Sequence, residues 1–94
     1  MSTASADGRR YGFVGILVTD RKSRGGRINQ ILAAHGELIV GRLGMPNLED
    51  GELSIITLIV RGTPEELSSL TGKLGGLPGV SVKSALHKID GVST

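Results

Sequence analysis

Hydrophobic and polar positions along the chain alternate between strand-like and helix-like stretches. Residues 11–20, YGFVGILVTD, and residues 53–62, LSIITLIVRG, are nearly continuous β-type apolar runs and predict two strands. Residues 37–45, ELIVGRLGM, and residues 79–88, GVSVKSALHK, predict two more strands. Between the second and third strands, PNLEDGE supplies proline, asparagine and an Asp-Gly pair, which are typical of a turn.

A first helix is predicted within residues 27–36, RINQILAAHG. Its apolar residues Ile28, Ile31 and Leu32 recur at helical spacing, and Gly36 marks its end. This helix lies between the first two predicted strands, so the first half of the chain has the order strand, helix, strand.

A second helix is predicted to begin near residue 64. Thr63 and Glu66 have the spacing of a capping box, with Pro64 at the first helical position. A leucine stripe follows, and the run stops at Gly75-Gly76 before Pro78. The stretch LTGKLGG therefore predicts a helix end, where exposed carbonyl groups repel phosphate, and not a phosphate-binding loop.

The two halves together predict an α+β fold. Two right-handed β-α-β units give a ferredoxin-like (ACT-like) βαββαβ arrangement, a four-stranded antiparallel sheet with two helices on one face. The first and third strands should be central, because they are the most continuously apolar. The domain is expected to span residues 11–88, with flexible tails at residues 1–10 and 89–94.

Both faces of the central strands are apolar. In the first strand Val14, Ile16 and Val18 alternate with Phe13 and Leu17, and the third strand repeats the pattern. Two helices can cover only one face, so a homo-oligomer, dimer or tetramer, is expected to cover the other or to extend the edge strand. The alternative is a monomer that tolerates scattered exposed aliphatic side chains. The candidate interface residues are Ile39, Val40, Arg42 and Lys83.

Composition excludes several classes of protein. The 94 residues include no cysteine, so disulfides and thiolate chemistry are absent. Eleven basic residues nearly balance nine acidic ones and only Tyr11 and Phe13 are aromatic, which disfavours nucleic-acid binding. Neither a secretion signal nor an apolar run long enough for a membrane span is visible. A cytoplasmic protein without a membrane partner is expected.

Catalytic and metal-binding patterns are also missing. His35 and His87 are the only histidines, and their spacing cannot place two imidazoles on one helical face. His35 falls in the last turn of the first predicted helix, where an imidazolium complements the helix dipole. The carboxylates form no paired constellation, so no catalytic residue, no metal, no cofactor and no enzymatic activity is expected.

The stretch TDRKSRGGR is the candidate site for a small anionic effector. It joins a central strand to a helix start, where the dipole is positive and backbone N–H groups are free. Ser23 could cap the helix, and two glycines would let a ligand approach the backbone. The candidate ligand-binding residues are Asp20, Arg21, Ser23, Arg24, Gly25, Gly26 and Arg27. The alternative is a solvated basic loop.

The stretches IVGRLGMP and LTGKLGGLPGVSVKSAL resemble the small ACT-like proteins described as iron-only hydrogenase system regulators. The resemblance covers residues 11–88. It implies a ferredoxin-like fold, oligomers, and kinship with ligand-sensing domains such as the effector domain of nickel-responsive repressors. It also implies that the loop after the first strand lies near a subunit interface and binds an effector. The histidine and cysteine metal ligands of the nickel-responsive relatives are missing here.

The resulting hypothesis is a non-catalytic, homo-oligomeric ACT-like regulatory domain linked to iron-only hydrogenase maturation, which senses a small effector or docks a partner. The alternative is a DNA-binding transcriptional regulator. Because the ten residues before Tyr11 are too few for a DNA-binding module, that role would require a separate DNA-binding partner.

Overall fold

The computed structural model describes residues 8–19 and 21–88 and confirms the predicted βαββαβ order. A short 3-10 helix, η1, separates α1 from β2. The elements are β1 Arg10–Thr19, α1 Arg21–Ala34, η1 Gly36–Leu38, β2 Ile39–Leu48, β3 Leu53–Gly62, α2 Pro64–Gly75 and β4 Val80–Leu86.

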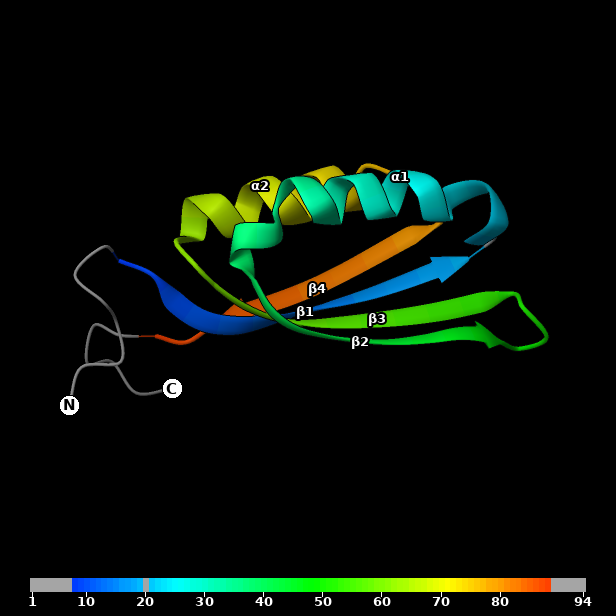
Figure 1. Cartoon of the computed structure of the whole chain (residues 1–94), viewed down its shortest axis with the longest axis horizontal. Helices are drawn as coiled ribbons and strands as arrows, with labels where there is room; N and C mark the ends of the chain where they lie inside the picture. Colours follow the sequence, from blue (N-terminus) through cyan, green and yellow to red (C-terminus); the bar gives the residue numbers. More distant parts are fainter. Residues whose placement is uncertain (1–7, 20, 89–94) are drawn as a thin grey trace.

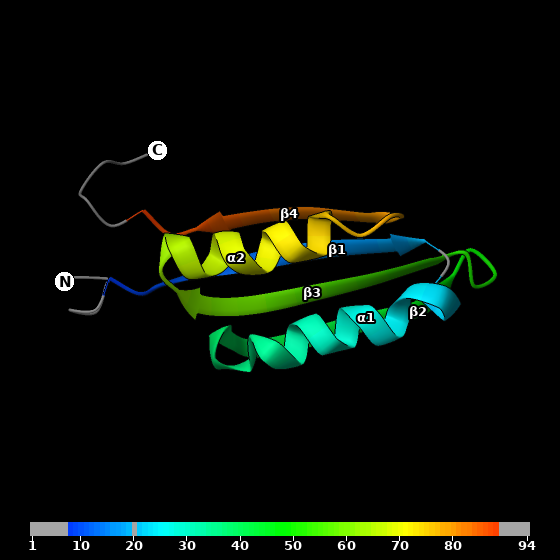
Figure 2. The same cartoon turned by 90° about the horizontal axis from the view of Figure 1, so that it is seen from above.

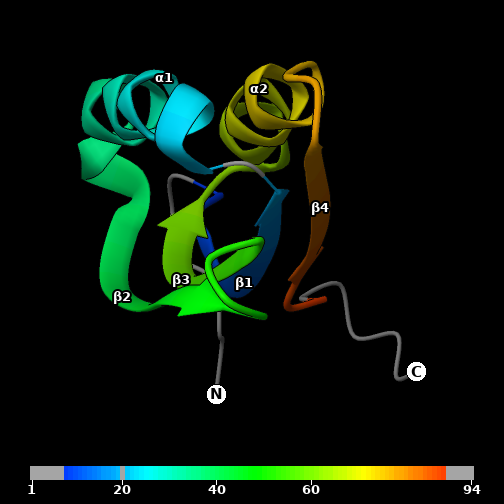
Figure 3. The ribbon, with the colours of Figure 1, turned by 90° about the vertical axis from the view of Figure 1, so that its right-hand side faces the viewer.

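The four strands form one antiparallel sheet in the order β2-β3-β1-β4, so the first and third strands are central, as predicted. Both helices lie on one face of this sheet (Figure 1). Seen from above, α1 runs along the β2–β3 side and α2 along the β1–β4 side (Figure 2). The end view shows the same two layers, with the opposite face of the sheet free of helices (Figure 3).

The core lies between the sheet and the helices. Alternation along β1 buries Val14, Ile16 and Val18 completely and leaves Phe13 and Leu17 on the other face, as predicted. The remaining buried apolar residues come from the helix side of β3, from both helices and from η1: Ile28, Ile31, Leu32, Leu38, Ile56, Leu58, Val60, Leu67, Leu70 and Leu74. Each fully buried aliphatic side chain contributes about 1.5–3 kcal/mol, so this layer supplies most of the favourable free energy of folding.

The start and end of α2 agree with the sequence. The Thr63 Oγ1 atom accepts the Glu66 N–H (3.1 Å), and Glu66 Oε1 accepts the Thr63 N–H (2.9 Å), which completes the predicted capping box. The helix ends at Gly75, and the Gly76 N–H bonds to the Gly72 carbonyl (3.1 Å). LTGKLGG is therefore a helix end.

Two boundaries differ from the prediction. Helix α1 begins at Arg21 instead of near Arg27, so the stretch predicted as a loop is helical. The first turns of α1 have no apolar stripe, and Gly25 and Gly26 each disfavour a helix by about 1 kcal/mol relative to alanine. The hydrophobic pattern therefore did not predict a helix in this segment. Strand β2 continues through Pro46, because an edge strand does not need every N–H for the sheet.

In the described part of the chain, neither helix is long and apolar enough to cross a membrane.

Candidate functional site

The helix-free face of the sheet carries most of the large apolar side chains that the described part of the chain exposes. Strand register places Ile59 beside Phe13, with Gly41 and Ala85 at the two ends of the same row. The row below it contains Leu43, Thr57, Gly15 and Lys83, and the next contains Met45, Ile55, Leu17 and Ser81. We call these three rows the open face.

Large apolar side chains on the open face stand in solvent. Phe13 is 50% exposed, Ile59 46% and Leu17 42%, while Leu43 and Met45 are more than half exposed. Phe13 is paired with Ile59, and Leu17 shares a row with Ile55 and Met45, so the apolar side chains gather on one face of the sheet. The row between them adds Leu43 but also Thr57, Gly15 and Lys83. A gathering of exposed apolar side chains on one face is typical of an interaction site.

The four predicted interface residues occupy different surfaces. Ile39 is partly buried against the core. Val40 is exposed beside a β-bulge of the edge strand β2. Arg42 is paired with the buried Leu58 on the helix side of the sheet, and its Nη2 donates to Asn29 Oδ1 of α1 at 3.3 Å. Lys83 stands exposed on the open face, because side chains alternate along β4 and its neighbour Val82 is partly buried on the helix side.

The predicted ligand-binding residues fall in and just before α1. Asp20 lies outside the described residues, and the side chains of residues 21–24 are likewise not described. Gly25 is buried in the helix, and open space surrounds the Cβ position of Gly26. Arg27 Nη1 donates to Gln30 Oε1 at 3.4 Å. Because α1 begins at Arg21, Ser23 is a helical residue and not the N-cap, and the role of this segment in ligand binding stays a prediction.

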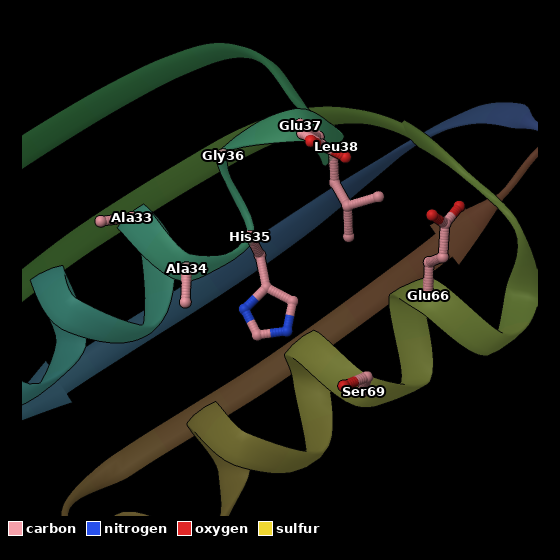
Figure 4. Close-up of a pocket in the computed structure, with 8 residues that line it drawn as sticks. All are labelled: Ala33, Ala34, His35, Gly36, Glu37, Leu38, Glu66 and Ser69. Atoms are coloured by element: carbon pink, nitrogen blue, oxygen red, sulfur yellow. The ribbon is translucent and has the colours of Figure 1, made fainter.

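A cleft of about 620 Å³ lies between the end of α1 and the first turns of α2 (Figure 4). The His35 imidazole extends toward α2, near Ser69, and its Nδ1–H donates to the Ile31 carbonyl at 2.9 Å. This bond satisfies an orphan carbonyl at the helix end, so His35 helps to end α1. The cleft is lined by Ala33, Ala34, His35, Gly36, Glu37, Leu38, Glu66 and Ser69.

Glu66, on the α2 side of this cleft, has a structural role. The Thr63 N–H bonds to its Oε1 and the Arg9 guanidinium pairs with its Oε2 at 2.9 Å. These two contacts, the Thr63 bond first, hold the pKa of Glu66 below its ordinary value. Among the described residues, no group of three histidine, cysteine or acidic side chains could hold a metal ion. The sequence predicted the capping box. It could not predict the cleft, because α1 and α2 come together only in the tertiary structure.

Comparison with known proteins places this geometry in a family. Residues 10–84 match the TM1266-like family, described as "Iron-only hydrogenase system regulator, putative". The solved structure of TM1266 from Thermotoga maritima is 31% identical, with a TM-score of 0.79 over 85% of this chain and 99% of that one. No curated protein matches the chain.

More distant structures share the fold. The crystal structure of the ACT domain from GTP pyrophosphokinase of Chlorobium tepidum has a TM-score of 0.68 at 19% identity, over 82% of this chain and 99% of that one. The C-terminal domain of MgtC from Mycobacterium tuberculosis has a TM-score of 0.59 at 18% identity, over 89% and 94%. The fold is thus ACT-like, and the match over residues 10–84 shows that the chain belongs to the TM1266-like family of iron-only hydrogenase system regulators.

Proposed function

We propose that this protein is a non-catalytic regulatory domain that acts as a homo-oligomer and senses a small anionic effector. The process that it regulates is proposed to be linked to iron-only hydrogenase maturation. The observation that carries the proposal is the apolar open face, which a second subunit would cover. The family description, a system regulator, and the ACT-like fold support a regulatory role.

Subunit pairing through the open face is favoured over pairing through an edge strand. The edge strand β2 has irregular register between Ile39 and Gly41 and again between Met45 and Leu48. It also contains Pro46 and a positive φ of 61° at Asn47. Bulges, prolines and local twist are devices that prevent edge-to-edge pairing.

The helix-free side of the sheet, of which the open face is the central part, approaches the size of a dimer interface. Three of the four strands have ten residues. Strands about 4.8 Å apart with a rise of about 3.3 Å per residue make the whole sheet roughly 19 by 33 Å, about 600 Å² in projection. Side-chain relief raises the accessible area further, toward the ~800 Å² that each partner contributes to a standard interface.

The effector is proposed to bind near the N-terminal half of α1. The positive end of the helix dipole attracts anions. Arg27 adds positive charge from the helix, and Arg42 adds it from β2, where its bond to Asn29 holds it against the same helix. Subunits that meet on the open face leave this side of the sheet accessible, so binding and assembly could occur together.

Light scattering of the purified protein at micromolar concentration tests the proposal. The expected result is a mass of at least two subunits, whereas a monomer at every concentration would contradict it. A thermal-shift screen of small carboxylates and phosphates then tests for an effector, because a ligand that binds only the folded protein raises its melting temperature. Failure of the whole panel would contradict the sensing role but leave the oligomer in place.

A further inference from the structure

Charged side chains are unevenly distributed along the helix-free side of the sheet. The three rows of the open face contain Lys83 but no carboxylate. The next row beyond Phe13 adds Arg61, which is paired with Tyr11. The guanidinium carbon of Arg61 lies 6.0 Å from the centre of the Tyr11 ring. Three exposed carboxylates lie at the opposite end of the sheet, in the β2–β3 turn (Figure 1): Glu49, Asp50 and Glu52.

The two charged ends are equally far from the middle of the sheet. Thr57 stands in the middle row of the open face, and Arg61 and Leu53 are each four residues from it along β3. At about 3.3 Å per residue, both lie about 13 Å from that row. Glu52 directly precedes Leu53. Reversal of the sheet about the middle row therefore exchanges the position of Arg61 with that of the acidic turn.

Gly15 lies at the centre of the open face, between Thr57 and Lys83 of the middle row. It does not have the positive φ that would require glycine. A Cβ built on it would meet only the Lys83 carbonyl oxygen, at an ordinary contact distance of 3.9 Å. Its own subunit therefore has room for a side chain. Since glycine weakens the interior of a strand and often marks the close approach of another backbone, the centre of the open face is where a second sheet would come closest.

We propose that a second copy of the chain packs on the open face with its strands reversed, so that the acidic turn of each subunit faces Arg61 of the partner subunit. The proposal rests on the proposed function, for which it specifies how the two subunits are oriented. Two aligned sheets packed face to face keep their strands within about 30° of a common direction, and two identical subunits in a closed pair are related by a two-fold axis. The axis can then run either along the strands or across them.

Charge distinguishes the two orientations. An axis along the strands places Arg61 against Arg61 of the partner subunit and one acidic turn against the other, so like charges meet at both ends. An axis across the strands, along the middle row, brings opposite charges together at both ends. The rows of Phe13 and Leu17 then face each other, so apolar surface still meets apolar surface. Complementary charges of this kind fix the orientation of an interface more than its affinity.

The axis across the strands also brings the two copies of Lys83 together. Lys83 stands on β4, which is an edge strand of the sheet. A lysine side chain at an edge can turn outward and keep its ammonium group in water. One repulsive contact at the edge is therefore outweighed by attractive contacts at both ends.

Charge reversal tests the orientation by sedimentation velocity at low salt. Arg61→Glu and the double change Glu49→Lys/Glu52→Lys should each raise the dissociation constant of the dimer about tenfold, because attraction becomes repulsion at both ends. All three changes in one chain should restore the wild-type constant, because opposite charges meet again. With the axis along the strands, each variant would only replace one like-charge contact by another, so unchanged constants would overturn the proposal.

Two further variants complete this series, with thermal melts to show that every variant is folded. Lys73→Glu, in the last turn of α2, makes the same change in net charge away from the open face and should leave the constant unchanged. If it weakens the dimer as much as Arg61→Glu, net charge causes the effect and the proposal is wrong. Gly15→Val should raise the constant at least about tenfold, because two added side chains would hold the sheets apart. An unchanged or lower constant would contradict the close approach at the centre.

Distances between nitroxide labels, measured by electron paramagnetic resonance, report the orientation directly. The chain has no cysteine, so Glu52→Cys and Lys83→Cys each supply a single attachment point. With sheets about 10 Å apart and strands about 4.8 Å apart, reversed subunits place the two backbones at residue 52 about 35 Å apart and those at residue 83 about 10 Å apart. An axis along the strands would bring the backbones at residue 52 to about 11 Å. Pairing of two β2 edges would separate those at residue 83 by about 34 Å, and either result would overturn the proposal.

The same samples separate this proposal from the proposed function. A monomer at every concentration would contradict both of them. A dimer whose label distances match one of the other two arrangements would contradict only the reversed orientation.

Discussion

Substitution of Phe13 by alanine is the sharpest test of pairing through the open face. A phenylalanine side chain buries about 150–250 Å² when enclosed. Phe13 is 50% exposed, so roughly 100 Å² per subunit stays available to a partner. At about 25 cal/mol per Å², this area is worth about 2.5 kcal/mol in each subunit.

In a two-fold interface both copies of Phe13 contribute, which doubles the free energy of association lost. The alanine side chain still buries a small part of the area that phenylalanine buried. The expected loss is therefore about 4 kcal/mol per dimer, or roughly a 1,000-fold increase in the dissociation constant. Sedimentation velocity over a concentration series measures this constant directly. Since Phe13 also contacts its own sheet, a thermal melt must show that the variant is folded.

Val40→Ala is the matched control for Phe13→Ala. Val40 is 59% exposed, as accessible as Phe13, but it lies at the irregular part of the edge strand β2. Its substitution should change the dissociation constant little if subunits meet on the open face. If Val40→Ala weakens assembly and Phe13→Ala does not, pairing runs through the edge and the reasoning above is refuted.

Three further predictions concern stability. The contacts that lower the pKa of Glu66 stabilise the folded protein at any pH above 4.5, the ordinary pKa of this carboxyl. This stabilisation is lost as the pH falls through the lowered pKa, so in acid melts the wild type should lose more stability than Glu66→Gln. Gly62→Ala should destabilise by about 1–3 kcal/mol in urea, because its Cβ would approach Leu38 Cδ2 to 2.9 Å. Ser54→Ala should stabilise the protein by about 1 kcal/mol, because it removes a buried hydroxyl that has no hydrogen-bond partner among the described residues. An unchanged melting temperature would count against that.

Much of the architecture could be predicted because local patterns determine it. The alternation around Val14 and Ile16, the Thr63–Glu66 capping box and the glycines that end α2 each act over a few residues, and all were confirmed. The start of α1 could not be predicted in the same way. In residues 21–26 the arginines and the lysine favour a helix, but Gly25 and Gly26 oppose it and no apolar stripe is present, so packing of the following apolar stripe decides the boundary.

The candidate sites show where sequence reasoning stops. By itself the sequence determined which side chains share a strand face, and hence that a second apolar face exists, because side chains alternate along every strand. Only the tertiary structure decided which residues from different strands become neighbours. It placed Phe13 beside Ile59 and Ala85, separated Arg42 from Lys83, and buried the Ser54 hydroxyl without a hydrogen-bond partner among the described residues. The physical reason is that strand order and register, which bring distant segments together, depend on the packing of the whole core and not on any local pattern.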